Sequence, residues 1–378
     1  MRPYHHGLGL IYFSKHKNIK VQSKIIIVGA GLSGLLLGYR LKLAGIPFKI
    51  IESRDRIGGR IHTLMSVNDT PVEMGATWFG DQHTHLKQLL HELNIPYFEQ
   101  YMEGTSFFQP FSTSPASAIP IPSQPPSYRI AGGTSSLTHA MATAIGNDVI
   151  ALNEHVKGID FSENNVTVYT NDKSFEGSKI ILAIPPKLWS NTIDFLPSLP
   201  NELKDIATKT HTWMEDSIKV AITFNQPFWR QQKQSVTLFS NTGPITELYD
   251  HCNYEENKYA LCGFVNSGFK RLTIEERKKI ILEQLNSVFG NSINSYTDYN
   301  EQIWSLENNT FFENQIPLFP HQNNGNPIFQ KSYFNDKLLI TSAEVSPICP
   351  GYMEGAIVSS MLLTKKIINT TMPNKKLN

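Results

Sequence analysis

One stretch near the start of the chain restricts the fold more than any other. Residues 24–28 are a short β-branched run, typical of a buried parallel strand, and they lead directly into three glycines at GxGxxG spacing. An apolar segment typical of a helix, residues 32–43, follows. Gly29 allows a sharp turn, Gly31 allows a pyrophosphate to approach the backbone, and Gly34 allows the helix to pack closely on the sheet. This order of strand, turn and helix predicts a dinucleotide-binding unit within an α/β fold.

The end of the second predicted strand restricts the nucleotide. Residues 48–51 form another short apolar run, and Glu52 follows it. A carboxylate at this point accepts hydrogen bonds from the hydroxyls of an adenosine ribose and disfavours a 2′-phosphate, so NADP is not expected. GxGxxG alone is a weak signal, and a glycine-rich turn in another α/β protein is the alternative.

A second glycine motif narrows the cofactor to FAD. Glu52 begins the pattern ExxxRxGGR, which NAD-dependent Rossmann domains do not need. Its glycine pair allows a second close approach of backbone to cofactor, and its arginines place positive charge beside a pyrophosphate. Without the glycines, the arginines would indicate only a solvated basic turn. The cofactor-binding residues expected in this motif are Glu52, Arg54, Arg56, Gly59 and Arg60.

Further blocks, in the same order along the chain, resemble the flavin-containing amine oxidase family, which includes monoamine and polyamine oxidases. After ESRDRIGGRIHT come PVEMGATWFG, RIAGGTSSL, ILAIPP, EDSIKVAITFNQPFW and SAEVSPICPGYMEGAI. The resemblance implies a Rossmann-like FAD-binding domain with an interleaved, shortened α+β substrate domain. It also implies that Gly75 and Ala76 pass close to the isoalloxazine ring. By the same resemblance, Val156 meets the adenine through its backbone, and Glu344 lies near the ribityl chain or the pyrophosphate.

Lys219 is the first residue expected to act in catalysis. Ile218 and Val220 alternate with it along a predicted strand, and this pattern alone indicates a solvated lysine. The match of SIK and the downstream QPFW to the family's active-site lysine favours a catalytic role instead. In the family this lysine holds a water against flavin N5, and a cation there stabilises negative charge on the reduced ring.

Tyr352 is the second expected catalytic residue. It lies in GYMEGA, a turn that precedes a predicted amphipathic helix at residues 356–367, whose N-terminus favours charge on the reduced flavin. Met353 in this turn is expected to contact the cofactor. Tyr352 matches one wall of the family's aromatic cage, and Phe311 or Phe312 is expected to form the opposite wall. A core tyrosine at the helix entry is the alternative.

The chain also departs from the family pattern. Covalent members carry a cysteine in the segment that corresponds to residues 308–312, and none is present here, so FAD is expected to be bound non-covalently. The segment 80–128 is shorter than the corresponding segment of typical members. The roof of the substrate cavity should therefore be thinner, more open or supplied by another subunit, which makes a homodimer possible. Within them, residues 109–126 are rich in Pro and Ser and predict an irregular surface loop. Cys349 is expected to be a small buried apolar residue.

The expected domains are discontinuous. The FAD-binding domain takes residues 24–79, 129–208 and 334–368, and the tails are 1–23 and 369–378. The substrate domain takes residues 80–128 and 209–333, including a polar helix at 273–289.

Composition excludes several classes of function. The 378 residues carry a net charge of +1, which provides no broad basic surface for nucleic acid. The three cysteines have no metal-binding spacing, which indicates a reducing compartment and no metal site. No stretch approaches the roughly 20 apolar residues of a membrane span. The sequence therefore predicts a cytoplasmic protein without a membrane partner.

Three functions remain open. The leading expectation is an amine oxidase, in which the α-carbon of a small neutral amine gives hydride to flavin N5 and O2 becomes hydrogen peroxide. The second is an FAD-dependent dehydrogenation of a larger substrate, as in carotenoid desaturases and protoporphyrinogen oxidase. The third is a flavin-bearing protein with little catalysis.

Overall fold

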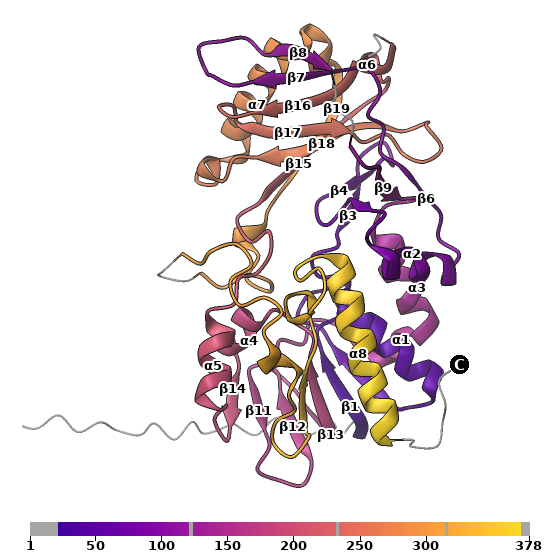
Figure 1. Ribbon diagram of the computed structural model, residues 1–378, viewed down its shortest axis with the longest axis vertical. Helices are drawn as coiled ribbons and strands as arrows, with labels where there is room; N and C mark the ends of the chain where they lie inside the picture. The colour runs from indigo at the N-terminus through magenta and orange to yellow at the C-terminus, as the bar shows by residue number, and fades with distance from the viewer. Residues whose placement is uncertain (1–21, 121–123, 232–233, 314–316, 372–378) are drawn as a thin grey trace, which may run out of the picture.

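The computed structural model describes residues 22–120, 124–231, 234–313 and 317–371. Its strands form two large sheets towards opposite ends of the long axis, with smaller sheets between them (Figure 1). One large sheet has eight strands and contains the first strand of the chain, and the other has seven strands and contains Lys219. Each sheet joins segments that are distant in the sequence.

The eight-stranded sheet has the order β10-β2-β1-β13-β12-β11-β14, and β20 pairs with β13. Its strands are β1 (Gln22–Val28), β2 (Phe48–Ile51), β10 (Ile150–Ala151), β11 (Gly158–Asp160), β12 (Val166–Tyr169), β13 (Ser174–Leu182), β14 (Asp194–Leu196) and β20 (Leu338–Ile340). β1 pairs in parallel with both β2 and β13, so its apolar residues 25–28 are buried on both faces. The strands expected at 24–28 and 48–51 are confirmed.

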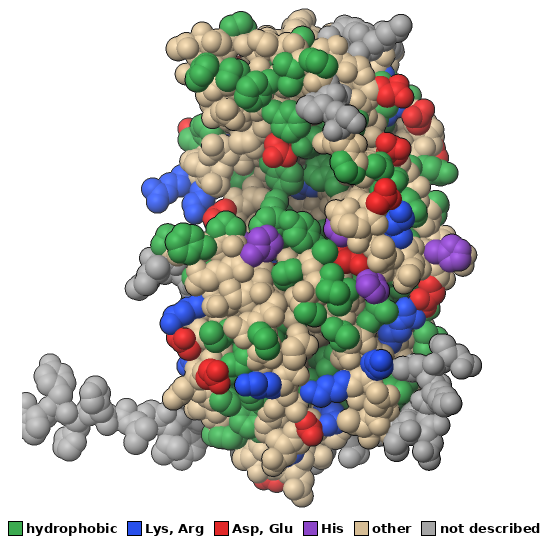
Figure 2. Space-filling model, viewed as in Figure 1, with side chains coloured by type: hydrophobic (Ala, Val, Ile, Leu, Met, Phe, Trp, Pro, Cys, Tyr) green, Lys and Arg blue, Asp and Glu red, His purple; other side chains and the backbone are tan. Residues whose placement is uncertain are grey.

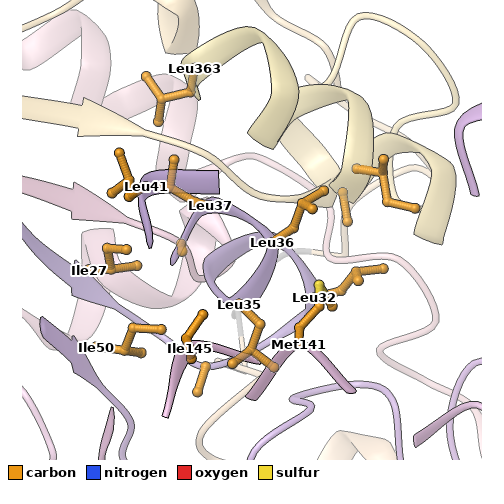
Figure 3. Close-up of a cluster of buried hydrophobic side chains, with 14 of the residues drawn as sticks. Ile27, Leu32, Leu35, Leu36, Leu37, Leu41, Ile50, Met141, Ile145 and Leu363 are labelled. Atoms are coloured by element: carbon orange, nitrogen blue, oxygen red, sulfur yellow. The ribbon is translucent and has the colours of Figure 1, made fainter. Parts of the chain in front are cut away.

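Helices cover this sheet. α1 (Leu32–Ala44) packs on α3 (Ser135–Ile145) and on α8 (Met353–Thr371), and α2 (Thr84–Glu92) contacts α8. Figure 3 shows their shared core, in which leucines of α1 meet Ile27 and Ile50 of the sheet, Met141 and Ile145 of α3, and Leu363 of α8. α1 confirms the helix expected at 32–43.

The seven-stranded sheet has the order β19-β15-β18-β17-β16-β7-β8. Its strands are β7 (Thr105–Gln109), β8 (Ser117–Pro120), β15 (Ile218–Phe224), β16 (Gln234–Ser240), β17 (Ile245–Asp250), β18 (Tyr259–Val265) and β19 (Tyr296–Ile303). α7 (Ile274–Phe289) buries Ile281 and Leu285 in the same core as Val220 and Leu248 of the sheet. The polar helix expected at 273–289 is confirmed, and its first turn is closed by a capping box between Thr273 and Glu276.

Two expectations about element boundaries are wrong. Residues 117–120 are not an irregular loop but the edge strand β8, which pairs antiparallel with β7. Proline is compatible with an edge strand, because an N–H that faces solvent needs no partner in the sheet. α8 begins at Met353 rather than at residue 356, with Gly355 inside its first turn.

Small elements connect the two large sheets. β3 (Thr63–Met65) pairs with β4 (Pro71–Glu73), and β9 (Ser127–Ile130) lies between β5 (Phe79–Gly80) and β6 (Tyr97–Glu99). The other helices are α4 (Pro186–Thr192), α5 (Asn201–Thr208) and α6 (Phe228–Gln231), with 3-10 helices η1 (Asn147–Val149), η2 (Ser267–Phe269), η3 (Asn291–Ser295), η4 (Trp304–Leu306), η5 (Pro327–Gln330) and η6 (Ala343–Val345). Of the helices in the described ranges, none has both the length and the hydropathy needed to span a bilayer.

Candidate active site

A cavity of about 400 Å³ is lined by residues of both large sheets. Figure 2 shows the surface hollowed at mid-height, between the parts of the molecule that contain the two sheets. The cavity brings together most of the residues singled out from the sequence, namely Gly29, Gly31, Glu52, Arg54, Gly59, Arg60, Gly75, Ala76, Val156, Lys219, Tyr352 and Met353. Four others, Gly34, Arg56, Glu344 and Phe311, are not in its lining.

The glycine-rich turn has the geometry that a pyrophosphate site requires. Gly29 has a φ of +106°, and its N–H donates to the carbonyl of Ile51 at 2.8 Å. A Cβ on Gly34 would come within 2.0 Å of the Gly29 carbonyl oxygen, whereas a Cβ on Gly31 would meet no other atom closer than 4.0 Å. No side chain caps α1 and no acidic residue lies in its first turn. The N-terminus of α1 can therefore receive a phosphate.

Glu52 is held rigidly at the cavity wall. Its Oε2 accepts from the Ala30 N–H at 2.8 Å, and its Oε1 accepts from the Arg54 N–H at 3.0 Å. Each carboxylate oxygen can accept more than one hydrogen bond, so these contacts leave capacity for ribose hydroxyls. The side chain is buried, so its charge is fixed beside the glycine turn.

The three arginines of the motif have different roles. Arg54 donates to Glu307 Oε2 at 3.0 Å, while Arg60 forms a bidentate pair with the buried carboxylate of Glu344 at 2.5 and 3.0 Å. Arg56 donates instead to backbone carbonyls of its own turn, and burial, followed by the charge of Arg54, lowers its pKa. Arg56 therefore stabilises the turn through its backbone carbonyls, and Glu344 lies behind Arg60. Neither Arg56 nor Glu344 lines the cavity, although the sequence predicted that both lie near the cofactor.

Unpaired polar groups in the wall fit a bound dinucleotide. Ser342 Oγ is buried and has no partner among the described residues. The backbone N–H and carbonyl of Val156 likewise form no hydrogen bond within the described part of the chain. Buried polar groups are normally paired, so both positions indicate contacts with a ligand.

Lys219 lies in β15, whose residues are buried on both faces, and it is only 2% exposed. The solvated alternative is therefore wrong. Its Nζ donates to the Gly75 carbonyl at 2.6 Å and to Thr77 Oγ1, and it lies 4.6 Å from the centroid of the Trp78 ring. Burial lowers the pKa of Lys219, and the nearby Cys262 and Glu73 oppose that effect.

Tyr352 is 40% exposed at the mouth of the cavity. Its ring centroid lies 5.3 Å from that of Trp213, 6.0 Å from that of His321 and 6.2 Å from that of His83. Phe311 lies elsewhere, with its ring 4.6 Å from Lys187 Nζ. The structure does not bring Phe311 to Tyr352. The aromatic neighbours of Tyr352 come from chain segments that the sequence did not predict to lie near it.

Several lining residues were missed in the sequence. Thr77 and Trp78 directly follow Ala76 and could have been found from that position. Phe264 reaches the site because it pairs with Lys219 across β15 and β18, which no local pattern indicates. Trp213 and His83 depend in the same way on tertiary packing. Burial lowers the pKa of His83, which favours its neutral form.

The three cysteines are all free. Cys252 and Cys262 are buried and free, while Cys349 is free but only partly buried, less than expected from the sequence. No cysteine lines the cavity in the described ranges. Within the same ranges, no group of three or more His, Cys, Asp or Glu side chains is arranged to hold a metal ion.

Comparison with known proteins gives a consistent result. The family described as flavin containing amine oxidoreductase matches residues 32–127 and 123–362. A probable flavin-containing monoamine oxidase A of Dictyostelium discoideum is 22% identical, over 93% of this chain and 98% of its own. A putrescine oxidase of Kocuria rosea is 23% identical, over 71% of this chain and 79% of its own.

Solved structures share the fold. Putrescine oxidase bound to putrescine has a TM-score of 0.79 at 22% identity, over 92% of this chain and 99% of that chain. Cyclohexylamine oxidase from Brevibacterium oxydans has a TM-score of 0.79 at 20% identity, with the same coverage. Since the family match spans most of the chain and includes most of the residues that line the cavity, this protein belongs to the flavin-containing amine oxidoreductases.

Proposed function

We propose that this protein oxidises a small amine at a non-covalently bound FAD, with O2 as the final electron acceptor. The family match and the amine oxidases among the relatives favour this function over the desaturase-like alternative. The observation that carries the proposal is Lys219, a buried lysine in the wall of the flavin cavity. Burying a lysine without a carboxylate partner is unfavourable, so its position indicates a function rather than a contribution to stability.

The bound FAD would supply a two-electron acceptor: the amine loses hydride from its α-carbon and a proton from its nitrogen and leaves as an imine, and O2 takes up these two electrons and two protons to form hydrogen peroxide. Four parts of the cavity wall would hold the nucleotide. The α1 N-terminus would receive the pyrophosphate, Glu52 the ribose, the Val156 backbone the adenine, and Ser342 a polar group of the cofactor.

Lys219 supplies positive charge on the reacting side. Its ammonium group lies against the rings of Trp78 and Phe264, and these apolar neighbours lower the local dielectric constant. A fixed cation in such a low-dielectric setting stabilises negative charge on the reduced cofactor and on oxygen far more than it would in water. The Gly75 carbonyl holds the ammonium group in place.

Tyr352 would orient the amine. The electron-rich faces of Tyr352 and Trp213 favour a polar nitrogen, and their mutual packing limits their movement. Tyr352, Met353 and Ala356 bring the N-terminus of α8 into the cavity wall, where its dipole favours developing negative charge.

Other expectations remain proposals with their own support. The cysteine-free lining supports non-covalent FAD, and acid precipitation should leave the flavin in the supernatant. The two sheets support the domain boundaries given above, which limited proteolysis would test. Cytoplasmic location and homodimer formation would be tested by cell fractionation and by light scattering.

Peroxide release from a panel of amines tests the function. The purified protein should release peroxide with at least one aliphatic, aromatic or diamine substrate, and Lys219→Met should lower this rate about a hundredfold. Lys279→Met, at an exposed position of α7, is the matched control and should act like the parent. Equal turnover by Lys219→Met would contradict the role of this lysine.

A further inference from the structure

A second, smaller cavity of about 20 Å³ lies behind Lys219. Its lining includes Glu73, Arg129, His251 and Thr77. Thr77 also lines the large cavity and accepts a hydrogen bond from Lys219 Nζ, so one residue joins the two spaces. A polar cavity of this size is large enough for one water molecule.

Glu73 presents an unpaired acceptor to this cavity. The residue is 3% exposed and lies at the end of β4. Its Oε1 accepts from the Thr134 N–H at 2.5 Å and from Thr63 Oγ1 at 2.9 Å. Its Oε2 has no hydrogen-bond partner among the described residues. A buried carboxylate oxygen without a partner is costly, so an unseen donor is expected.

Arg129 presents an unpaired donor to the same cavity. The residue is 5% exposed and lies in β9. Its Nη1 donates to His251 Nδ1 at 3.1 Å, and its Nη2 donates to the Cys252 carbonyl at 2.6 Å. Its Nε–H has no partner in the described ranges. Glu73 and Arg129 thus each have one buried side-chain atom without a hydrogen-bond partner among the described residues, and the two atoms are complementary, an acceptor and a donor.

The charges around this cavity act on Lys219 in opposite directions. Burial has the largest effect and lowers the pKa of Lys219, Glu73 opposes it, and Arg129 adds to it; Cys262 would oppose it only as a thiolate, which its own burial disfavours. Lys219 in turn lowers the pKa of Glu73, although burial dominates there and raises it. His251 stays neutral, because burial, then Arg129 and Lys219, hold its pKa well below its usual value.

We propose that the small cavity binds one ordered water that bridges Glu73 Oε2 and Arg129 Nε, and that this bridge fixes an anion and a cation behind Lys219, where they act on it in opposite directions. Glu73 and Arg129 are positioning residues, because they act through Lys219 and are absent from the lining of the flavin cavity. The water accepts from Arg129 Nε–H and donates to Glu73 Oε2, so both groups become satisfied. The catalytic consequence rests on the proposed function, but the water and the charge coupling do not.

A crystal structure of the holoprotein tests the first part. It should show density for one water within hydrogen-bond distance of both Glu73 Oε2 and Arg129 Nε. A dry cavity, or a direct Glu73–Arg129 ion pair in its place, would overturn the proposal. This measurement needs no variant and no turnover.

Titration of Lys219 tests the second part. The holoprotein is labelled with [13Cε]lysine, and the Lys219 signal is assigned by its absence in Lys219→Met. Glu73→Gln should move the midpoint of this signal to lower pH, because an anion that favours the ammonium form is lost. Arg129→Gln should move it to higher pH, because a repelling cation is lost. Glu283→Gln, which removes a charge at an exposed position of α7, should leave it unchanged.

Two opposite shifts support the inference, whereas no shift, or shifts in the same direction, would overturn it. If Glu73→Gln does not fold, Arg129→Gln still gives a signed result. A failure of this inference can also be distinguished from a failure of the proposed function. If Lys219→Met turns over like the parent while the water and both shifts are found, amine oxidation through Lys219 fails and the charged network stands.

Discussion

The two sides of the flavin cavity are built in different ways. The side that we propose holds the nucleotide comes largely from one stretch of chain, residues 29–60, in which each turn is closed by its own glycines and backbone. The side that we propose faces the substrate, called the reacting side below, combines Lys219 from β15, Phe264 from β18, and Tyr352 from the entry to α8. The first side is specified by local spacing, and the second by the register of a sheet and the docking of distant segments. Substitutions on the two sides should therefore have different consequences.

The largest effect is expected on the nucleotide side. Gly34→Ala places a Cβ within 2.0 Å of the Gly29 carbonyl oxygen, and this clash is with backbone that cannot rotate away. We expect the variant to lose about 3 kcal/mol of stability and its bound FAD, because α1 must move off the sheet. Thermal unfolding and the flavin absorbance of the purified protein measure both losses. Leu43→Ala, at an exposed position of α1, is the control. If Gly34→Ala is yellow and as stable as the parent, the close approach of α1 to the Gly29 carbonyl oxygen is not required for this turn.

The next effect concerns the ion pair that connects Arg60 of the second glycine motif to Glu344 of η6. Arg60→Met leaves the fully buried Glu344 without its bidentate partner. We expect a loss of about 3 kcal/mol, because an uncompensated buried carboxylate remains. Adding Glu344→Gln should recover part of the loss, which denaturant unfolding would show. If the double variant is no more stable than Arg60→Met, the buried charge is not the cause.

A smaller effect is expected on the reacting side. Tyr352→Ala removes the ring at the cavity mouth, and we expect kcat/KM for the amine to fall about tenfold. Phe311→Ala should change it less than about twofold, because Phe311 contacts Lys187 rather than the cavity. Steady-state kinetics of both variants compare the two directly. A larger loss of kcat/KM in Phe311→Ala would support the expectation from the sequence that Phe311 lies opposite Tyr352.

The smallest effect lies far from both sides. Thr273→Ala removes the side-chain oxygen that accepts from the Glu276 N–H at the start of α7. It should cost about 1 kcal/mol of stability and leave turnover and bound FAD unchanged. Thermal unfolding and peroxide assays distinguish these outcomes. Reduced turnover at full flavin occupancy would show that α7 is coupled to the site.

The same contrast explains what the sequence could predict. The bounds of β2 and the start of α1 follow from residues that are close together in the sequence, and both are found. Lys219 could be chosen only through its resemblance to a family, since its strand pattern alone favoured a solvated residue. The neighbours of Tyr352 could not be predicted, because His83 and Trp213 reach it through packing between distant segments.

Two further differences have physical causes of the same kind. β8 is rich in Pro and Ser and looks like a loop, but at the edge of a sheet only part of its backbone must pair. Arg56 was expected beside the pyrophosphate because of its charge, and Glu344 was expected near the ribityl chain or the pyrophosphate only by resemblance to the family. Such a side chain can contact the cofactor or instead stabilise a neighbouring residue. The choice depends on the direction of the side chain, which the spacing of residues in the sequence does not specify.

Anaerobic mixing of the purified holoprotein with amines tests the central claim most directly, because it follows the bound flavin itself. Non-covalent FAD in this cavity should lose its yellow absorbance with at least one amine of an aliphatic, aromatic and diamine panel, and regain it when O2 is admitted. Persistence of the yellow colour with every amine, in protein that carries stoichiometric FAD, would contradict the account.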